Sequence, residues 1–154
     1  RVGGTVRVPG DKSISHRALM LAALAQAPSR VPTVLDSADV RSTAAVLRAL
    51  GADVPGLAPD MRIAGAAGGL RAPSVDLDCG NSGTTTRLMA GVVAARPIAA
   101  RFVGDDSLSR RPMRRVARPL EAMGARVAFE RDDGRLPMIV HGGAWNIPDD
   151  QVEP

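Results

Sequence analysis

The distribution of apolar and polar residues along the chain predicts helices that alternate with short strands. Helix formers or apolar residues at a spacing near 3.6 predict helices at about 13–25, 40–50, 84–95 and 112–123. Short apolar or alternating stretches predict strands at 30–35, 52–54, 61–64, 75–79, 102–103, 126–129 and 138–140. A Gly-rich segment at 65–69 predicts a hairpin-like turn. Together these elements predict a mixed α/β (α+β) fold.

The second half of the chain resembles the first half. Each half is expected to follow the order helix, strand, helix, strand, strand, in units of about 5–65 and 75–143. The clearest similarity pairs residues 47–54 with residues 120–127, at an offset of 73. In a tandem repeat, equivalent helices present equivalent N-termini, so two ligand sites could share one face. The alternative is that short Ala, Leu and Gly helix ends resemble each other by chance.

The stretch 8–25 places cations at the start of the first predicted helix. A Pro-Gly pair ends the preceding segment, and Asp11 or Ser13 can take the N-cap. The first turn of a helix exposes unpaired N–H groups and the positive end of its dipole, and Lys12 and Arg17 add two full charges there. This arrangement predicts an anion site. An ordinary solvated helix start is the alternative.

A second candidate site lies at 79–87, before and inside the third predicted helix. Its two glycines let a ligand touch the backbone, and its Asn, Ser and Thr side chains supply hydrogen-bond donors. Arg87 adds a cation one turn into the helix. The alternative interpretation is a helix start with more capping residues than it needs.

A third cationic stretch, at 107–115, holds four arginines within six positions. Arg110 and Arg111 precede the predicted helix, so either could grip a carboxylate or phosphate with its planar guanidinium. Arg114 and Arg115 lie on adjacent faces of that helix, and solvated surface charges explain at least some of these residues. Three cationic helix starts in one domain are stronger evidence for an anion site if they face the same way.

Four further residues have the chemistry for a site but no partner that the sequence identifies. His16 lies among cations and is more typical of a surface or supporting group than of a base. Cys79 is expected to be a small buried residue. Asp105 and Asp106 could act as acid and base, although a turn that leads into a helix explains them more simply.

Composition narrows the class of protein. The 154-residue chain is 45% hydrophobic but only 2% aromatic, so its core must be aliphatic. Its single cysteine excludes an internal disulfide, and no Cys or His cluster supports a metal site. No apolar run is long enough for a membrane span, and no apolar leader precedes residue 10. We therefore expect a cytoplasmic chain without membrane contact or metal.

The net charge of +4 raises the question of nucleic-acid binding. The basic residues are interleaved with 16 acidic ones, and only two Phe and one Trp are available to stack on bases. Small anionic substrates explain the charge more simply. A basic nucleic-acid-binding module remains a remote alternative, and it would show a steep salt dependence.

Three blocks of the sequence together resemble the signature of the 5-enolpyruvylshikimate-3-phosphate synthase family. They are Pro-Gly-Asp-Lys-Ser-Ile-Ser-His-Arg-Ala at 9–18, Gly-Asn-Ser-Gly-Thr-Thr at 80–85 with Arg87, and Ser-Arg-Arg-Pro-Met at 109–113. The likeness runs over about 4–143. It implies transfer of the enolpyruvyl group of phosphoenolpyruvate to the 5-hydroxyl of shikimate 3-phosphate, with release of phosphate, on the shikimate route to aromatic amino acids. It also implies that no metal or organic cofactor takes part.

The resemblance also implies roles for residues of the three blocks. Shikimate 3-phosphate would be held by Lys12, Ser13 and Arg17. Phosphoenolpyruvate would be held by Lys12, Gly83 and Arg111, with Asn81, Thr84 and Arg87 in support. The inhibitor glyphosate is expected to bind, because a residue larger than glycine at position 83 would crowd it. The family's proton-transfer residues belong to a second domain, so no catalytic residue is expected in this chain.

The family resemblance implies a longer protein than this chain. Its fold has two domains of three α/β units each, so residues 1–143 would supply about two of the three units of the N-terminal domain. The tail at 144–154 is acidic and bounded by prolines, and it does not resemble the expected third unit. An alternative function follows, that of a truncated fragment that binds anions without catalysis. Unpaired strand edges could also drive self-association.

Overall fold

The computed structural model describes residues 3–6, 8–66 and 69–143. Its helices are α1 (Lys12–Leu24), α2 (Ala38–Ala49), α3 (Gly83–Ala94), α4 (Asp106–Ser109) and α5 (Arg114–Ala122). Its strands are β1 (Ser29–Pro32), β2 (Asp60–Ile63), β3 (Leu77–Asp78), β4 (Ala99–Val103), β5 (Arg126–Phe129) and β6 (Met138–His141). The predicted mixed α/β fold is confirmed. The divergent tail at 144–154 lies outside the described residues.

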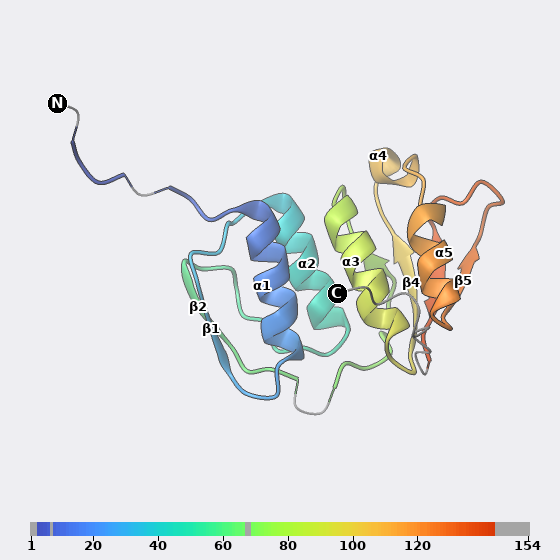
Figure 1. Ribbon diagram of the computed structural model, residues 1–154, viewed down its shortest axis with the longest axis horizontal. Coiled ribbons are helices and arrows are strands. Elements are labelled where there is room, and N and C mark those ends of the chain that lie inside the picture. Colours follow the sequence, from blue (N-terminus) through green and yellow to red (C-terminus); the bar gives the residue numbers. More distant parts are fainter. Residues whose placement is uncertain (1–2, 7, 67–68, 144–154) are drawn as a thin grey trace, which may run out of the picture.

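The strands form two sheets on opposite sides of the three long helices (Figure 1). Strands β1 and β2 pair antiparallel, with Val31 opposite Met61. The other sheet has the order β3-β4-β6-β5, in which only the β3–β4 pair is parallel. Strand β6 pairs with β5 in the register Val127 to Val140, so the predicted return of 138–140 onto 126–129 is confirmed.

Helices α1, α2 and α3 bury one apolar face each in a shared core. Leu19, Leu47 and Met89, one from each helix, are fully buried, and Phe102 of β4 is buried beside them. Apart from that phenylalanine, the buried hydrophobic side chains of the described residues are aliphatic or sulfur-containing, as the composition predicts. Close packing of these faces holds the helices together, and it therefore fixes the positions of the three helix N-termini relative to one another.

Three elements differ clearly from the expectation. Residues 52–54 do not form a strand, because the Ala52 N–H is used to close α2 and the guanidinium of Arg48 binds the carbonyls of Val54 and Pro55. The short helix α4 was not predicted, and the helix expected at 112–123 begins only at Arg114. Part of the predicted turn at 65–69 lies outside the described residues.

The helix ends at Gly51 and Gly124 are built alike, at the offset of 73 seen in the sequence. Both glycines have positive φ, +89° and +101°. The Gly51 N–H donates to the Arg48 carbonyl and the Gly124 N–H to the Glu121 carbonyl, and the next residue in each case bonds to the carbonyl one position earlier. This match supports a repeated unit. The number of units and their boundaries stay a prediction.

Alanine at Gly51 or Gly124 is expected to lower the free energy of unfolding by about 1–2 kcal/mol each, because a Cβ disfavours the left-handed backbone. Urea unfolding measures this loss. Gly91 gives the matched control. It lies inside α3, and a Cβ there would meet no described atom within 4 Å beyond its own helix, so alanine should stabilise by about 1 kcal/mol. Unequal costs at the two helix ends would argue against equivalent units.

Candidate functional site

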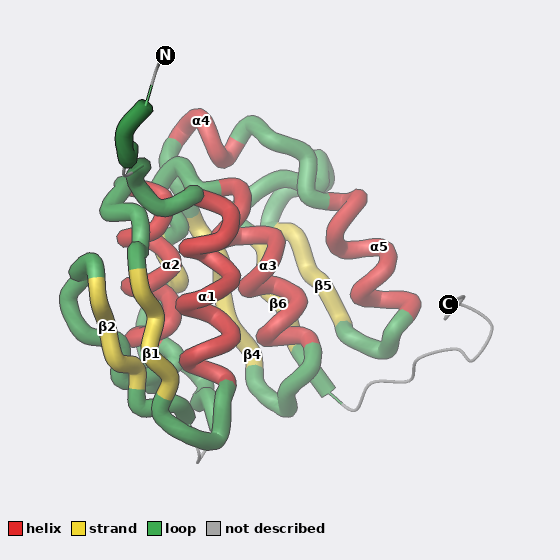
Figure 2. The backbone as a smooth tube through the Cα atoms, turned by 60° about the vertical axis from the view of Figure 1, so that its left-hand side comes forward, coloured by secondary structure: helices red, strands yellow, loops and turns green. Residues whose placement is uncertain are grey.

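Helices α1, α2 and α3 run side by side and begin at the same end of the molecule (Figures 1 and 2). Buried contacts fix this alignment. Nδ1 of His16 lies 2.6 Å from the hydroxyl oxygen of Thr43, which lies 2.7 Å from that of Thr85. Each of these residues lies in the first or second turn of its helix. The positive dipole ends of α1 and α3 are therefore directed to the same end.

The first cationic group surrounds the start of α1. Asp11 is the N-cap, and its Oδ1 accepts the Ile14 N–H at 2.8 Å. Nζ of Lys12 lies 3.0 Å from Oδ2 of Asp39, in the first turn of α2. Arg17 folds back so that its guanidinium donates to the Ser13 carbonyl at 3.1 Å. The predicted set of Lys12, Ser13 and Arg17 is exposed around one helix N-terminus, within reach of a ligand.

The second group surrounds the start of α3, which a tightly fixed loop precedes. Ser82 is the N-cap, and its Oγ accepts the Thr85 N–H at 3.1 Å. Gly80 adopts φ +54°, which suits glycine. Its N–H donates to Oδ1 of Asp78 at 2.8 Å, and its carbonyl accepts the Asp105 N–H at 2.9 Å. The loop therefore holds α3 in place against the loop after β4.

Asn81 connects this loop to the third block. Its Oδ1 accepts from the Arg111 guanidinium at 2.5 Å, and its Nδ2 donates to Oδ2 of Asp105 at 2.7 Å. Asp105 also caps α4 through the Leu108 N–H. Hydrogen bonds from the Leu108 N–H and then from Asn81 lower the pKa of Asp105 below its usual value. An ionised cap fits a structural role for Asp105, so the acid and base interpretation is not favoured.

Two guanidinium groups meet over Gly83, the first residue of α3. A Cβ on Gly83 would lie 2.7 Å from Nη1 of Arg87 and 3.1 Å from Nη1 of Arg111. Within the described residues, neither arginine lies within ion-pair distance of a carboxylate, and the buried Nε of Arg87 has no hydrogen-bond partner. Burial first, and then the cations Arg115 and Arg111, lower the pKa of Arg87. A bound anion would relieve this repulsion.

The structure separates the two arginines that were expected to precede a helix as a pair. Arg111 faces Asn81 and Gly83, whereas Arg110 is exposed and lines another hollow together with Asp106 and Asp133. The unpredicted helix α4 lies immediately before this pair and turns the chain there. Only Arg111 therefore joins the second group.

His16 and Cys79 lie beneath the surface. The thiol of Cys79 is fully buried, as expected of a small core residue, and burial raises its pKa to about 11. His16 is also fully buried and contacts Thr43, so it supports the site from below. Burial is the main cause of its lowered pKa. Sequence reasoning missed the parts played by Asp39 and Thr43, both of which lie in α2.

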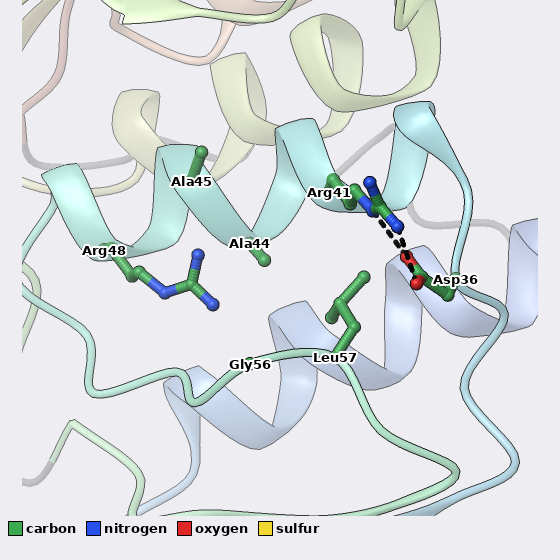
Figure 3. A pocket seen from close by; sticks show the side chains of 7 residues that line it. All are labelled: Asp36, Arg41, Ala44, Ala45, Arg48, Gly56 and Leu57. Carbon is green, nitrogen blue, oxygen red and sulfur yellow. Dashed lines mark hydrogen bonds and ion pairs between the residues drawn. The ribbon is translucent and has the colours of Figure 1, made fainter.

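A hollow of about 480 Å³ between α2 and the loop at 56–57 is a different place (Figure 3). Its two cations are already engaged. Arg41 forms a two-point ion pair with Asp36, at 2.6 and 2.8 Å, and Arg48 binds backbone carbonyls. This hollow is therefore a weaker candidate for an anion-binding site than the helix N-termini are.

The fold and site together define an α/β domain whose cations gather at parallel helix N-termini, an arrangement suited to anions. Within the described residues, no group of three or more acidic, His or Cys side chains could hold a metal ion. In that same part of the chain, no helix is long and apolar enough to cross a bilayer.

Comparison with known proteins places this domain in a family. The family profile described as EPSP synthase (3-phosphoshikimate 1-carboxyvinyltransferase) matches residues 1–149. A 3-phosphoshikimate 1-carboxyvinyltransferase of Acidithiobacillus ferrooxidans is 52% identical over 146 residues, which cover 92% of this chain and 33% of that protein. The one from Nitrobacter winogradskyi is 51% identical over 152 residues, 94% of this chain and 34% of that protein. The EPSP synthase structure from Acinetobacter baumannii has a TM-score of 0.86 at 39% identity, over 91% of this chain and 32% of that one.

The chain belongs to the EPSP synthase family. The predicted family resemblance is thus confirmed, and the fold matches a solved member of the family. The chain spans about a third of the length of the curated relatives that it matches.

Proposed function

We propose that this chain carries part of the substrate site of an enolpyruvyl transferase, which joins phosphoenolpyruvate to the 5-hydroxyl of shikimate 3-phosphate. In this reaction the hydroxyl oxygen bonds to C2 of phosphoenolpyruvate, and the bond from C2 to the phosphate oxygen breaks. The observation that carries the proposal is the pair of cationic helix N-termini at one end of the fold. Both substrates are anions, and family membership supports the reaction.

Shikimate 3-phosphate is assigned to the start of α1. Its phosphate would accept hydrogen bonds from Ser13 and from the cations of Lys12 and Arg17, all of which are exposed there. Lys12 is held over α2 by its ion pair with Asp39, at 3.0 Å, so its ammonium lies between the starts of α1 and α2. From this position Lys12 could also reach phosphoenolpyruvate.

Phosphoenolpyruvate is assigned to the start of α3. The absence of a side chain on Gly83 leaves room for the guanidinium groups of Arg87 and Arg111, and Asn81 holds Arg111 in place. Thr84 adds a hydroxyl in the first turn. Fixed cations of this kind stabilise the charge on a departing phosphate without having to reorganise during the reaction. Holding two reactants side by side also lowers the barrier.

The second candidate is an anion-binding fragment without turnover. It is favoured by the fact that the chain covers only about a third of its relatives, because half of a site that closes between two domains retains weak binding at most. The remote candidate, a nucleic-acid-binding module, finds less support. In the described residues the acidic side chains Asp36, Asp60 and Glu130 pair with arginines and so reduce any basic face.

Phosphate release from shikimate 3-phosphate plus phosphoenolpyruvate separates these candidates. Release by the purified chain, abolished by Lys12→Ala, would establish the transferase in 154 residues. Binding of shikimate 3-phosphate without release, lost in Lys12→Ala, is the result that we expect of a partial site. Salt-sensitive binding of arbitrary duplex DNA with neither substrate bound would overturn both assignments.

Three further proposals concern inhibitor binding, cellular location and self-association. Glyphosate would compete for the Gly83 site, where a Cβ would displace the two guanidinium groups. The reaction would take place in the cytoplasm. Self-association would involve the outer strands β3 and β5, each of which pairs on one side only within the described residues.

A further inference from the structure

A chain of buried hydroxyl groups links the starts of α1, α2 and α3. From Nδ1 of His16 it runs to Thr43 at 2.6 Å, from there to Thr85 at 2.7 Å, and on to Ser82 at 2.7 Å. All four side chains are buried, with exposed fractions of 0 to 1%. Burial makes each of these polar contacts costly to lose, because water cannot replace it.

The direction of the hydrogen bonds follows from one carbonyl group. The Thr85 hydroxyl lies 3.3 Å from the Asp39 carbonyl oxygen, which can only accept. If Thr85 gives its single proton to that carbonyl, it must accept from Thr43. Thr43 has then used its own proton and must accept from Nδ1 of His16. This chain of donors therefore requires a proton on Nδ1 of His16.

Ser82 gives the same direction. Its Oγ accepts the Thr85 N–H at 3.1 Å and the Thr85 hydroxyl at 2.7 Å, so Thr85 has no proton left for Thr43 whether Ser82 or Asp39 takes it. Nε2 of His16 is buried without a hydrogen-bond partner in the described residues, so a proton there would have no acceptor. Burial and the neighbouring cations Lys12 and Arg17 lower the pKa of His16, against an opposing effect of Asp39. The neutral form is therefore favoured.

Thr85 joins the hydroxyl chain to both cationic groups. Its hydroxyl lies against the backbone carbonyl of Asp39, whose carboxylate holds Lys12. The same hydroxyl lies 2.7 Å from Oγ of Ser82, the N-cap of α3, which directly precedes Gly83. A change in this chain of hydroxyl groups would therefore shift Lys12 and Gly83 relative to each other.

We propose that His16, Thr43 and Thr85 are positioning residues that set the spacing between the Lys12 and Gly83 anion sites. This role rests on the proposed function, since it presupposes that two anions bind side by side. The three residues touch neither ligand in this assignment. They act through Asp39 and Ser82.

The first test uses the chain without ligand, labelled with ¹⁵N in its two histidines. Long-range ¹H–¹⁵N correlation distinguishes a proton on Nδ1 from one on Nε2. We expect the Nδ1–H form for His16, with His141 of β6 as the internal reference signal. The Nε2–H form would overturn the proposed direction of these hydrogen bonds, whatever ligand the protein binds.

The second test compares Thr43→Val with Thr43→Ser by calorimetric titration with shikimate 3-phosphate and then with phosphoenolpyruvate. Valine has nearly the shape of threonine but lacks the hydroxyl, whereas serine keeps it. We expect valine to weaken binding of the second anion about tenfold, and serine to restore it. Equal affinities in the valine variant and the wild type would overturn the positioning role. A wild type that binds neither anion would overturn the proposed function and the positioning role with it, and the tautomer result would stand separately.

Discussion

Methionine in place of Arg111 is expected to weaken the binding of phosphoenolpyruvate about ten- to hundredfold, the cost of one charge-assisted hydrogen bond in a partly buried site. Arg87→Met should cause a loss of similar size. Both guanidinium groups converge on the position that a Cβ of Gly83 would occupy, so each contributes to the same anion site. Calorimetric titration of the purified chain measures the loss directly.

Arg110→Met is the matched control for Arg111→Met. Arg110 is the neighbouring residue and carries the same charge, but it is exposed and lines a different hollow. The Arg110→Met substitution should leave the affinity for phosphoenolpyruvate almost unchanged. Equal losses in Arg110→Met and Arg111→Met would show that only the net charge matters, and the assignment of a site at Gly83 would then be wrong.

Alanine in place of Gly142 is expected to destabilise the fold by on the order of 3 kcal/mol, a large part of the stability of a small domain. Its Cβ would lie 2.1 Å from the carbonyl oxygen of Arg96 and 2.2 Å from that of Val93. Both are backbone atoms at the end of α3, so no side chain can move aside. The free energy of unfolding in urea measures the cost.

Gly143→Ala is the control for this substitution. Among the described residues, a Cβ on Gly143 would meet no atom within 4 Å, although its N–H bonds to the Ala94 carbonyl just as that of Gly142 bonds to the Ile98 carbonyl. It should be nearly neutral. A neutral Gly142→Ala would mean that the chain after β6 does not pack against the end of α3 as described.

The sequence predicted the parts of the site that depend on local chemistry. Asp11, one of the two caps offered for the first helix, and a capping residue within 79–87, which is Ser82, follow with the cations beside them from residue types that stabilise helix starts in any context. The repeated helix ends at Gly51 and Gly124 follow from the same kind of rule. These features depend on residues within a few positions of each other, and a single sequence therefore contains the information.

The parts that the sequence did not predict depend on contacts between distant segments. Asp39 lies 27 residues from Lys12, and Thr43 lies 42 residues from Thr85. No pattern of spacing in the sequence predicts that these side chains will come into contact. The expected strand at 52–54 failed for a different, local reason, because the Ala52 N–H closes α2 and the Arg48 guanidinium binds the carbonyls of Val54 and Pro55.

The most direct test of the two-anion site is a ¹⁵N-edited NMR titration of the wild-type chain. Shikimate 3-phosphate should first shift the amide signals of 12–17, and phosphoenolpyruvate should then shift those of 80–87, each set saturating separately. Shikimate without its phosphate should have little effect on the first set. The account would be contradicted if both anions shifted the same scattered surface residues, or if the hollow beside Arg41 and Arg48 responded in place of the helix N-termini.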